Sequence, residues 1–150
     1  MNFLVVFVFT FVAFANAADV FSPQFREKLI QRVQEVGMKC AEQEKANGDD
    51  IGQLMARQNP TRKEGKCLIA CFNQAFGAQD KDGKFTKEGI AKSLEPFKKE
   101  NEGVYNTLVK LMDDCFKEVK SADRCEAAAE MGACFNKNAD KAGLKADMVL

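Results

Sequence analysis

The sequence contains six cysteines and no histidine, and these two facts restrict the chain more than any other feature. Without histidine it lacks the commonest zinc ligand, the usual base of Ser-His and Cys-His nucleophile pairs, and the usual proton donor near neutral pH. We therefore expect no catalytic residues, no metal site and no cofactor. The cysteines are Cys40, Cys67, Cys71, Cys115, Cys125 and Cys134.

Residues 1–18 predict a secretory signal peptide, with cleavage after Ala17 or Ala18. They carry no charged side chain, and an apolar core from Phe3 to Phe14 precedes the small residues Ala15-Asn16-Ala17. A membrane anchor would need about 20 apolar residues, and this run is shorter. Export delivers all six cysteines to an oxidising compartment, where an even number favours three disulfides over a metal or redox site.

Residues 19–150 are expected to form a single domain, because no linker or internal repeat divides them. They keep all 22 basic and all 22 acidic residues, so the net charge is +0. This balance provides no basic surface for nucleic acid or for anionic lipid. We expect no nucleic-acid partner and no membrane insertion.

Apolar residues recur at spacings of three and four, which predicts an all-α fold with about six helices. The first helix should begin at Ser22-Pro23, a capping hydroxyl followed by proline, and should end near the polar stretch EKANGDD. A short second helix should be capped by Asp49 or Asp50 and should end before Asn59-Pro60. The apolar stripe of the first helix is Phe25, Leu29, Val33, Val36 and Cys40.

The third helix contains the stretch KCLIACFNQAF, residues 66–76, whose wide apolar arc predicts a central, buried position. Thr86 is expected to cap the fourth helix, and Pro96 to kink it or limit it to about two turns. The fifth should carry a stripe of about four turns from Val104 to Val119, and Ser121 should cap the sixth. The C-terminal Met148-Val149-Leu150 either frays or folds back over an apolar opening.

The sequence DKDGKF, residues 80–85, partly matches a calcium loop. Asp80, Asp82 and Gly83 fit positions three, five and six, but Ala78 and Gly89 stand where the loop needs its terminal ligands. The Asp-Gly pair is more simply a turn between helices. The cysteine spacing also lacks the further cysteine of an iron-sulfur motif and any C-x-x-C redox pair.

Helix geometry disfavours two of the possible disulfides. Cys67 and Cys71 lie on successive turns of one helix face, where a bridge is strained. Cys125 and Cys134 are nine residues apart and therefore lie on opposite faces of the sixth helix. Excluding both pairs leaves ten of the 15 possible pairings open.

The complete cysteine string resembles that of the insect odorant-binding proteins, of the general odorant-binding and pheromone-binding type with six cysteines. The gaps between successive cysteines are 26, 3, 43, 9 and 8 residues, and the gaps of three and eight are the most constrained in that family. The resemblance implies about six helices around an apolar cavity, stapled by three disulfides. It implies the pairs Cys40–Cys71, Cys67–Cys125 and Cys115–Cys134, which are among the ten pairings left open.

The resemblance also implies a function. Members of that family are non-enzymatic secreted carriers that transport small hydrophobic molecules, odorants or pheromones, through the aqueous lymph around chemosensory neurons. The expected partner is a small apolar ligand, with an odorant receptor as a further candidate and a monomer or weak homodimer as the assembly. Two alternatives stay open: a carrier in another secretion, and a secreted helical interaction protein whose core is full.

For the pocket we select apolar residues on the helical stripes, and we expect about half of them to be ordinary core. Methionine in such a wall favours modest selectivity. Tyr105 is a candidate hydrogen-bond donor, placed either in the pocket or at its rim. The selected residues are Leu54, Met55, Phe72, Phe76, Leu94, Tyr105, Leu108, Leu111, Met112, Phe116, Met131 and Phe135.

Overall fold

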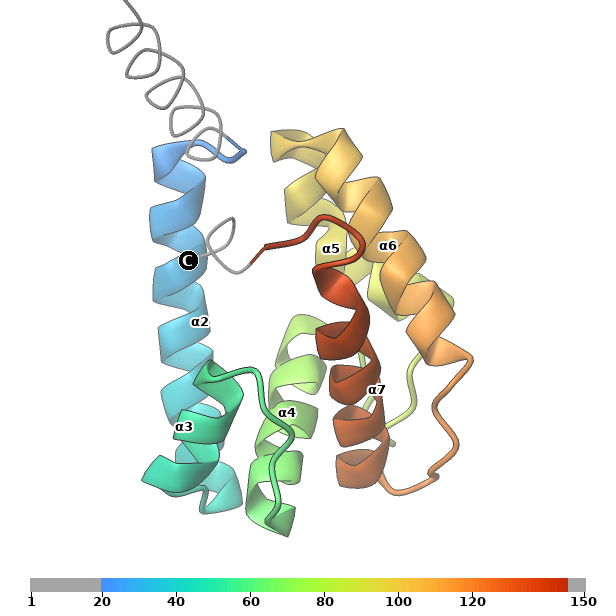
Figure 1. Ribbon diagram of the computed structural model, residues 1–150. Coiled ribbons are helices and arrows are strands. Elements are labelled where there is room, and N and C mark those ends of the chain that lie inside the picture. The colour runs from blue at the N-terminus through green and yellow to red at the C-terminus, as the bar shows by residue number, and fades with distance from the viewer. Residues whose placement is uncertain (1–19, 146–150) are drawn as a thin grey trace, which may run out of the picture.

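The computed structural model describes residues 20–145, and these form six α-helices, which confirms the all-α prediction. The predicted signal peptide and the tail residues Met148, Val149 and Leu150 lie outside the described residues. Between residues 20 and 145, no helix is long and apolar enough to cross a membrane. The helices are α2 (Pro23–Glu44), α3 (Gly48–Met55), α4 (Lys63–Phe76), α5 (Lys87–Glu100), α6 (Glu102–Phe116) and α7 (Arg124–Ala139) (Figure 1).

Helix α4 occupies the centre of the fold, as its wide apolar arc predicts. It packs against α2, α3 and α7, while α5 packs on α6 and α6 packs on α7. Figure 1 shows α4 between α2 and α7, with α5 and α6 together in the upper part of the view. The half formed by α2, α3 and α4 therefore meets the half formed by α5, α6 and α7 at the contact between α4 and α7.

Three disulfides join these helices, in the pairs that the family resemblance implies. Cys40–Cys71 connects α2 to α4, Cys67–Cys125 connects α4 to α7, and Cys115–Cys134 connects α6 to α7. The two cysteines of α4 thus send bridges to two different helices. The bridged Cα atoms lie 5.7, 4.4 and 5.5 Å apart, within the usual range for disulfides.

Helix α2 begins as its sequence predicts. The Ser22 side chain accepts a hydrogen bond from the Phe25 backbone N–H at 3.2 Å, and Pro23 opens the first turn. The helix ends at Glu44, because Lys45 adopts the left-handed conformation with φ of 56°. Both ends agree with the predicted bounds.

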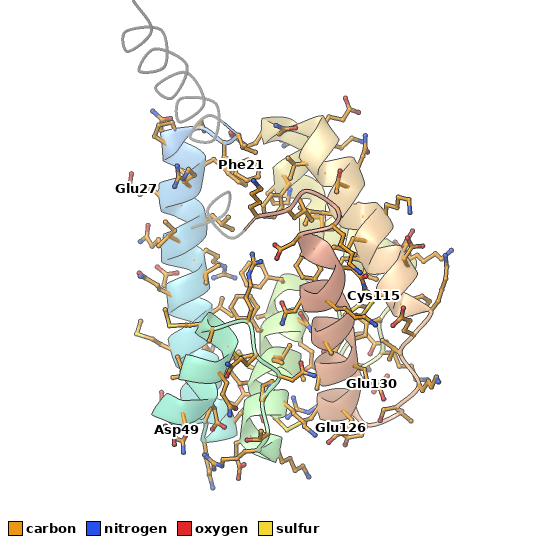
Figure 2. The ribbon with its side chains drawn as sticks, in the orientation of Figure 1. Phe21, Glu27, Asp49, Cys115, Glu126 and Glu130 are labelled. Atoms are coloured by element: carbon orange, nitrogen blue, oxygen red, sulfur yellow. A yellow bond between two sulfur atoms is a disulfide. The ribbon has the colours of Figure 1, made fainter. Side chains whose placement is uncertain are left out.

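The start of α2 is also held from outside the helix, by an aromatic clasp of Phe21, Phe25 and Phe97. The ring centroids lie 5.3 to 5.6 Å apart, and Phe21 is only 4% exposed. The hydroxyl of Ser22 donates to the Glu100 carboxylate at 2.9 Å, at the end of α5. Figure 2 shows Phe21 between the start of α2 and the α5–α6 corner. Helix α2 is therefore anchored to α5 at one end and to α4 at the other.

The predicted caps of α3 and α7 are wrong by a few residues. Asn47, not Asp49 or Asp50, caps α3: its Oδ1 accepts the backbone N–H groups of both aspartates at 3.0 Å. Asp50 completes a capping box by accepting the Asn47 N–H at 2.9 Å, so its carboxylate serves as the return partner instead of the cap.

At the start of α7, Asp123 is the cap in place of Ser121. Its Oδ1 accepts the N–H groups of Cys125 and Glu126, each at 3.0 Å. The Ser121 hydroxyl instead accepts the Asp123 N–H at 3.1 Å, one step earlier in the turn. A carboxylate also interacts more favourably than a hydroxyl with the positive end of a helix dipole, which explains why the later residue is the cap.

Helix α5 continues past Pro96 to Glu100, so the predicted limit of about two turns is wrong, while the alternative, a kink at Pro96, stays a prediction. Proline removes one internal hydrogen bond, but the neighbouring side chains are held by tertiary packing. Leu94 packs against the core, and Phe97 belongs to the aromatic clasp. Packing on both sides outweighs the local penalty. Helix α6, in turn, ends at Phe116, so Val119 lies in the following turn, where it still packs against the core.

The loop between α4 and α5 is a turn built around Asp80. Its Oδ1 accepts the N–H groups of Asp82 and Lys84 at 2.9 Å. The buried amide of Gln79 donates to the carbonyls of Gly83 and Arg124 at 2.7 and 3.0 Å, which ties this loop to the start of α7. Gly83, with φ of 81°, lies directly against Arg124.

We predict that Gly83→Ala destabilises the fold more than Gly77→Ala does. Both glycines have positive φ, 81° and 85°, so the backbone penalty is similar. A Cβ at Gly83 would overlap the Cβ of Arg124 and lie 2.9 Å from its Cα, whereas a Cβ at Gly77 meets nothing within 4 Å. The extra loss in the free energy of unfolding should be about 1 to 3 kcal/mol, measured by urea denaturation. Equal losses would show that the loop does not pack on α7 as described.

Candidate functional site

The buried apolar side chains form two main clusters. The α2–α4 cluster consists of Val36, Cys40, Leu68 and Cys71. The α5–α7 cluster is larger and takes residues from the loop before α5, from α5, α6 and α7, and from the chain after α7. Its members are Ala78, Phe85, Ile90, Leu111, Cys115, Ala127, Met131, Cys134, Ala139 and Leu144.

A separate group of small residues forms the contact between α4 and α7. Cys67, Ala70, Cys125 and Ala128 are all buried there, and Ala70 and Ala128 are completely inaccessible. Small side chains let two helices approach closely and leave no space between them. This α4–α7 contact is therefore a fixed wall of the molecule.

Ten large apolar side chains pack against the two main clusters and yet are only half-buried. In a filled core, side chains of this size would be expected to lose nearly all contact with solvent. Their remaining exposure is therefore apolar surface that residues 20–145 do not cover. They are Leu94, Val104, Leu108, Met112, Phe116, Val119 and Phe135 against the α5–α7 cluster, and Leu54, Phe72 and Phe76 against the α2–α4 cluster.

Helix α2 shows the same incomplete burial along its inner stripe. Only Val36 and Cys40, near the end that is bridged to α4, are buried within the helix. Leu29 and Val33, in the middle of the stripe, are half-buried. The helix makes its main helix contact with α4 and spans from there to the aromatic clasp. The middle of α2 thus presents apolar side chains that none of the helices α3 to α7 covers completely.

Ten of the twelve residues selected from the sequence lie in these two clusters or against them, and the structure divides them. Seven belong to the α5–α7 cluster, of which Leu111 and Met131 are buried and five are half-buried. Leu54, Phe72 and Phe76 belong with the α2–α4 cluster instead. Their common role as one pocket remains a prediction.

Met55 does not belong to the interior, because its side chain is 78% exposed. It follows Leu54 by one residue, or about 100° around the helix, and α3 is too short to bury both directions. Tyr105 is half-buried at the α5–α6 corner, and the Lys98 ammonium lies 5.5 Å from its ring centroid. A charged group over the ring places Tyr105 beside solvent, and its place in a pocket or at a rim stays a prediction.

Two surface hollows lie elsewhere, and neither contains any of the twelve selected residues. One, of about 480 Å³, lies over α3 and is lined mainly by polar residues such as Gln53 and Thr61. The other, of about 690 Å³, lies on the outer side of α2 between Pro23 and Gln34. Within residues 20–145, no group of three or more Cys, Asp or Glu side chains is arranged to hold a metal ion.

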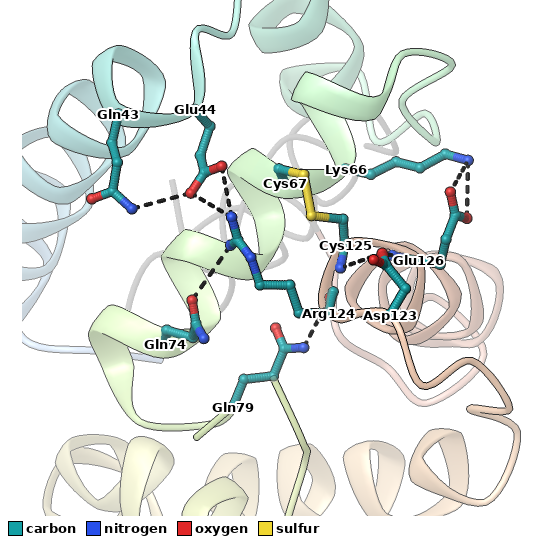
Figure 3. The surroundings of a disulfide bond; sticks show 10 residues. All are labelled: Gln43, Glu44, Lys66, Cys67, Gln74, Gln79, Asp123, Arg124, Cys125 and Glu126. Atoms are coloured by element: carbon teal, nitrogen blue, oxygen red, sulfur yellow. Dashed lines mark hydrogen bonds and ion pairs between the residues drawn. A yellow bond between two sulfur atoms is a disulfide. The ribbon is translucent and has the colours of Figure 1, made fainter. Parts of the chain in front are cut away.

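An ion pair that the sequence does not reveal supports the α4–α7 wall from the side of α2. Arg124 donates to both oxygens of Glu44 at 2.9 and 2.8 Å, and its other terminal nitrogen reaches Gln74 at 3.5 Å (Figure 3). The Glu44 side chain is only 10% exposed, and such bidentate pairs are strong and directional. Residues 44 and 124 are 80 positions apart, so no local pattern predicts their contact.

Two carboxylates hold the connection between α6 and α7. Glu130 accepts the backbone N–H groups of Lys120 and Ser121 at 2.7 and 3.1 Å, and these bonds lower its pKa from the ordinary value of 4.5. The pKa of the Asp123 carboxyl is lowered from 3.8, first by the N–H of Glu126. Hydrogen bonds to the charged form account for both directions.

Comparison with known proteins gives consistent matches. A model of the PBP/GOBP family matches residues 22–138. General odorant-binding protein 28a of Drosophila melanogaster is 27% identical over 121 residues, which are 80% of this chain and 85% of that protein. General odorant-binding protein 19d of the same organism is 26% identical over 111 residues, 74% of each chain.

A solved structure gives the same result at the level of the fold. The odorant-binding protein dmelOBP28a from Drosophila melanogaster superposes with a TM-score of 0.68 and 25% sequence identity. The match covers 80% of this chain and 99% of that chain.

We predict that the free energy of unfolding is the same at pH 7.4 and pH 5.5 and falls below about pH 4.5. A lowered pKa means that the folded state favours the charged carboxylate. The stabilisation from Asp123 and Glu130 is therefore complete above their ordinary values of 3.8 and 4.5 and is lost as the pH falls through the lower folded values. Urea unfolding at a series of pH values measures this.

Glu130→Gln should lower the stability at neutral pH and make the decline in acid shallower, whereas Glu118→Gln, at an exposed position, serves as the control. A loss of stability between pH 7.4 and 5.5 in the wild-type protein would contradict the assignment of these carboxylates as the acid-sensitive groups.

Proposed function

Because this chain belongs to the PBP/GOBP family, we propose that it is a secreted, non-enzymatic carrier of a small hydrophobic molecule. In this proposal the ligand lies between the α2–α4 cluster and the α5–α7 cluster. The α4–α7 contact separates it from solvent on one side. An odorant or pheromone is the proposed cargo, and the aqueous lymph around chemosensory neurons is the proposed place of action. An odorant receptor is the proposed recipient.

The observation that supports this proposal is the half-burial of the ten large apolar side chains around the two clusters. Exposed apolar surface in an interior is unfavourable, by about 25 cal/mol per Å². A hydrophobic ligand removes that surface from water, so its binding is driven by the same term that folds the chain. Because the ligand binds the folded state alone, it should also raise the thermal stability.

Helices from both clusters contribute to the proposed wall. Phe72 and Phe76 stack with their centroids 4.8 Å apart, on the turn of α4 that follows Cys71. The bridge to α2 fixes that turn, so the two rings have little freedom to collapse into the free space. Met112 and Phe116 contribute from the other cluster. They lie on the turn of α6 next to Cys115, which the disulfide to Cys134 ties to α7.

We predict that Phe72→Ala and Phe116→Ala each weaken the binding of an uncharged fluorescent apolar dye. Each variant removes one aromatic wall from a different cluster, and a loss of about tenfold, or about 1.4 kcal/mol, is expected from partial burial of such a ring. The matched control is Met55→Ala, which shortens an apolar side chain that is 78% exposed and should leave the affinity unchanged.

Dye titration of the correctly oxidised protein gives these affinities, and displacement by unlabelled apolar compounds verifies a shared site. The absence of saturable binding would exclude the carrier function and favour a secreted interaction protein. Loss of affinity in only one of the two phenylalanine variants would confine the ligand to that cluster.

We predict that the affinity for the uncharged dye changes little between pH 7.4 and pH 5.5. The chain has no histidine, and the carboxylates with lowered pKa titrate below this range. Titrations at the two pH values measure the change. A tenfold loss at pH 5.5 would show that other carboxylates, or the C-terminal tail, control release.

A further inference from the structure

One arginine of α2 lies against the aromatic wall of α4. The Arg32 guanidinium carbon is 5.9 Å from the centroid of the Phe76 ring. Arg32 is three residues after Leu29 and four before Val36, so it stands beside the inner stripe of α2. Its side chain therefore crosses from α2 to the last turn of α4, at the edge of the proposed ligand space.

No carboxylate among residues 20–145 forms an ion pair with Arg32. The other arginines at helix ends and in loops are paired: Arg57 with Asp140, Arg62 with Asp50 and Glu64, and Arg124 with Glu44. Arg26, on the same helix as Arg32, lines the outer hollow of α2 instead. Arg32 thus combines an unpaired charge with a contact to the proposed ligand wall.

The chemistry of guanidinium determines what this position can recognise. A guanidinium that stacks on a ring keeps the N–H donors at its edge free, and these match the two oxygens of a carboxylate. Phe76 in turn stacks on Phe72, which packs against the α2–α4 cluster, so the apolar surface is continuous from the charge inward. Arg32 itself is exposed, which lets a charged group bound to it remain hydrated.

We propose that Arg32 binds the carboxylate of a long-chain carboxylic acid, and that the hydrocarbon chain of this acid lies along Phe76 and Phe72 into the interior. The inference rests on the proposed carrier function and specifies the class of ligand within it. Ionised acids are then preferred over alcohols or esters of the same chain length, because only the carboxylate accepts a paired hydrogen bond from the guanidinium.

Lys98 over Tyr105 is a second cation on an aromatic ring, at the α5–α6 corner. It is therefore the alternative position at which a carboxylate could bind. Its ammonium group is a compact, strongly hydrated charge without the planar fork of arginine. The comparison of the two positions therefore tests whether recognition is specific to Arg32.

The test compares dodecanoic acid with dodecan-1-ol as competitors of an uncharged dye at pH 7.4, in wild-type protein and in Arg32→Gln. We expect Arg32→Gln to weaken the acid about three- to tenfold and to change the alcohol by less than about twofold, the size expected for an exposed ion pair. Arg32→Lys keeps the charge and should give an intermediate loss. Raising the salt concentration should weaken the acid alone.

Arg26→Gln and Lys98→Gln are the matched controls, and both should leave the acid affinity unchanged. The inference is overturned if Arg32→Gln changes acid and alcohol equally, changes neither, or if Lys98→Gln carries the effect instead. In each of these outcomes the alcohol still binds and the carrier proposal stands. If the dye shows no saturable binding to wild-type protein, both proposals fail together; if the dye binds but dodecanoic acid does not displace it, only the inference about Arg32 fails.

Discussion

The disulfide between Cys67 and Cys125 is the constraint on which the remainder of the structure depends. It joins α4 to α7 where Ala70 and Ala128 let the helices touch, and the second cysteine of α4 joins that same helix to α2. Each bridge can stabilise the folded state by about 2 to 4 kcal/mol, which a small domain otherwise gains by filling its core. Covalent bonds and small side chains hold the α4–α7 contact. The large apolar side chains are therefore not needed there and are available to line a ligand site.

Because the bridges and the small side chains hold the α4–α7 contact, the large apolar side chains elsewhere can remain incompletely buried. A chain that leaves apolar surface accessible forfeits packing energy, and a cavity costs on the order of 24 cal/mol per Å³. The bridges offset part of that cost, the Arg124–Glu44 pair and the aromatic clasp fix the ends of α2, and a bound hydrophobic molecule would supply more. The same frame would hold a cation, Arg32, at a fixed place on the aromatic wall.

The sequence predicts the helices from their periodicity and the family from the cysteine spacing, and both are confirmed. The cysteine pairing comes from the family resemblance alone, because helix geometry leaves ten pairings open. The caps predicted from the sequence for α3 and α7 are wrong, because several neighbouring polar side chains could each accept the first backbone N–H groups of the helix. The limit of about two turns for α5 is wrong, because the packing of Leu94 and Phe97 around Pro96 is not visible in the local sequence. The sequence shows Met55 as an apolar residue at helical spacing, but only the orientation of α3 shows that its side chain faces solvent. Arg32 does not interrupt the apolar stripe of α2, so the sequence does not single it out. Only its contact with Phe76 marks it as a candidate ligand-binding residue.

In the proposed carrier, side chains of the two clusters line one space that accepts a single apolar ligand. Intermolecular nuclear Overhauser effects between a bound ligand and methyl-labelled protein test it most directly. We expect contacts from one ligand molecule to Leu54 beside the α2–α4 cluster and also to Met112 beside the α5–α7 cluster. Contacts confined to the exposed Met38 and Met55 would contradict it, because the ligand would then lie on the surface.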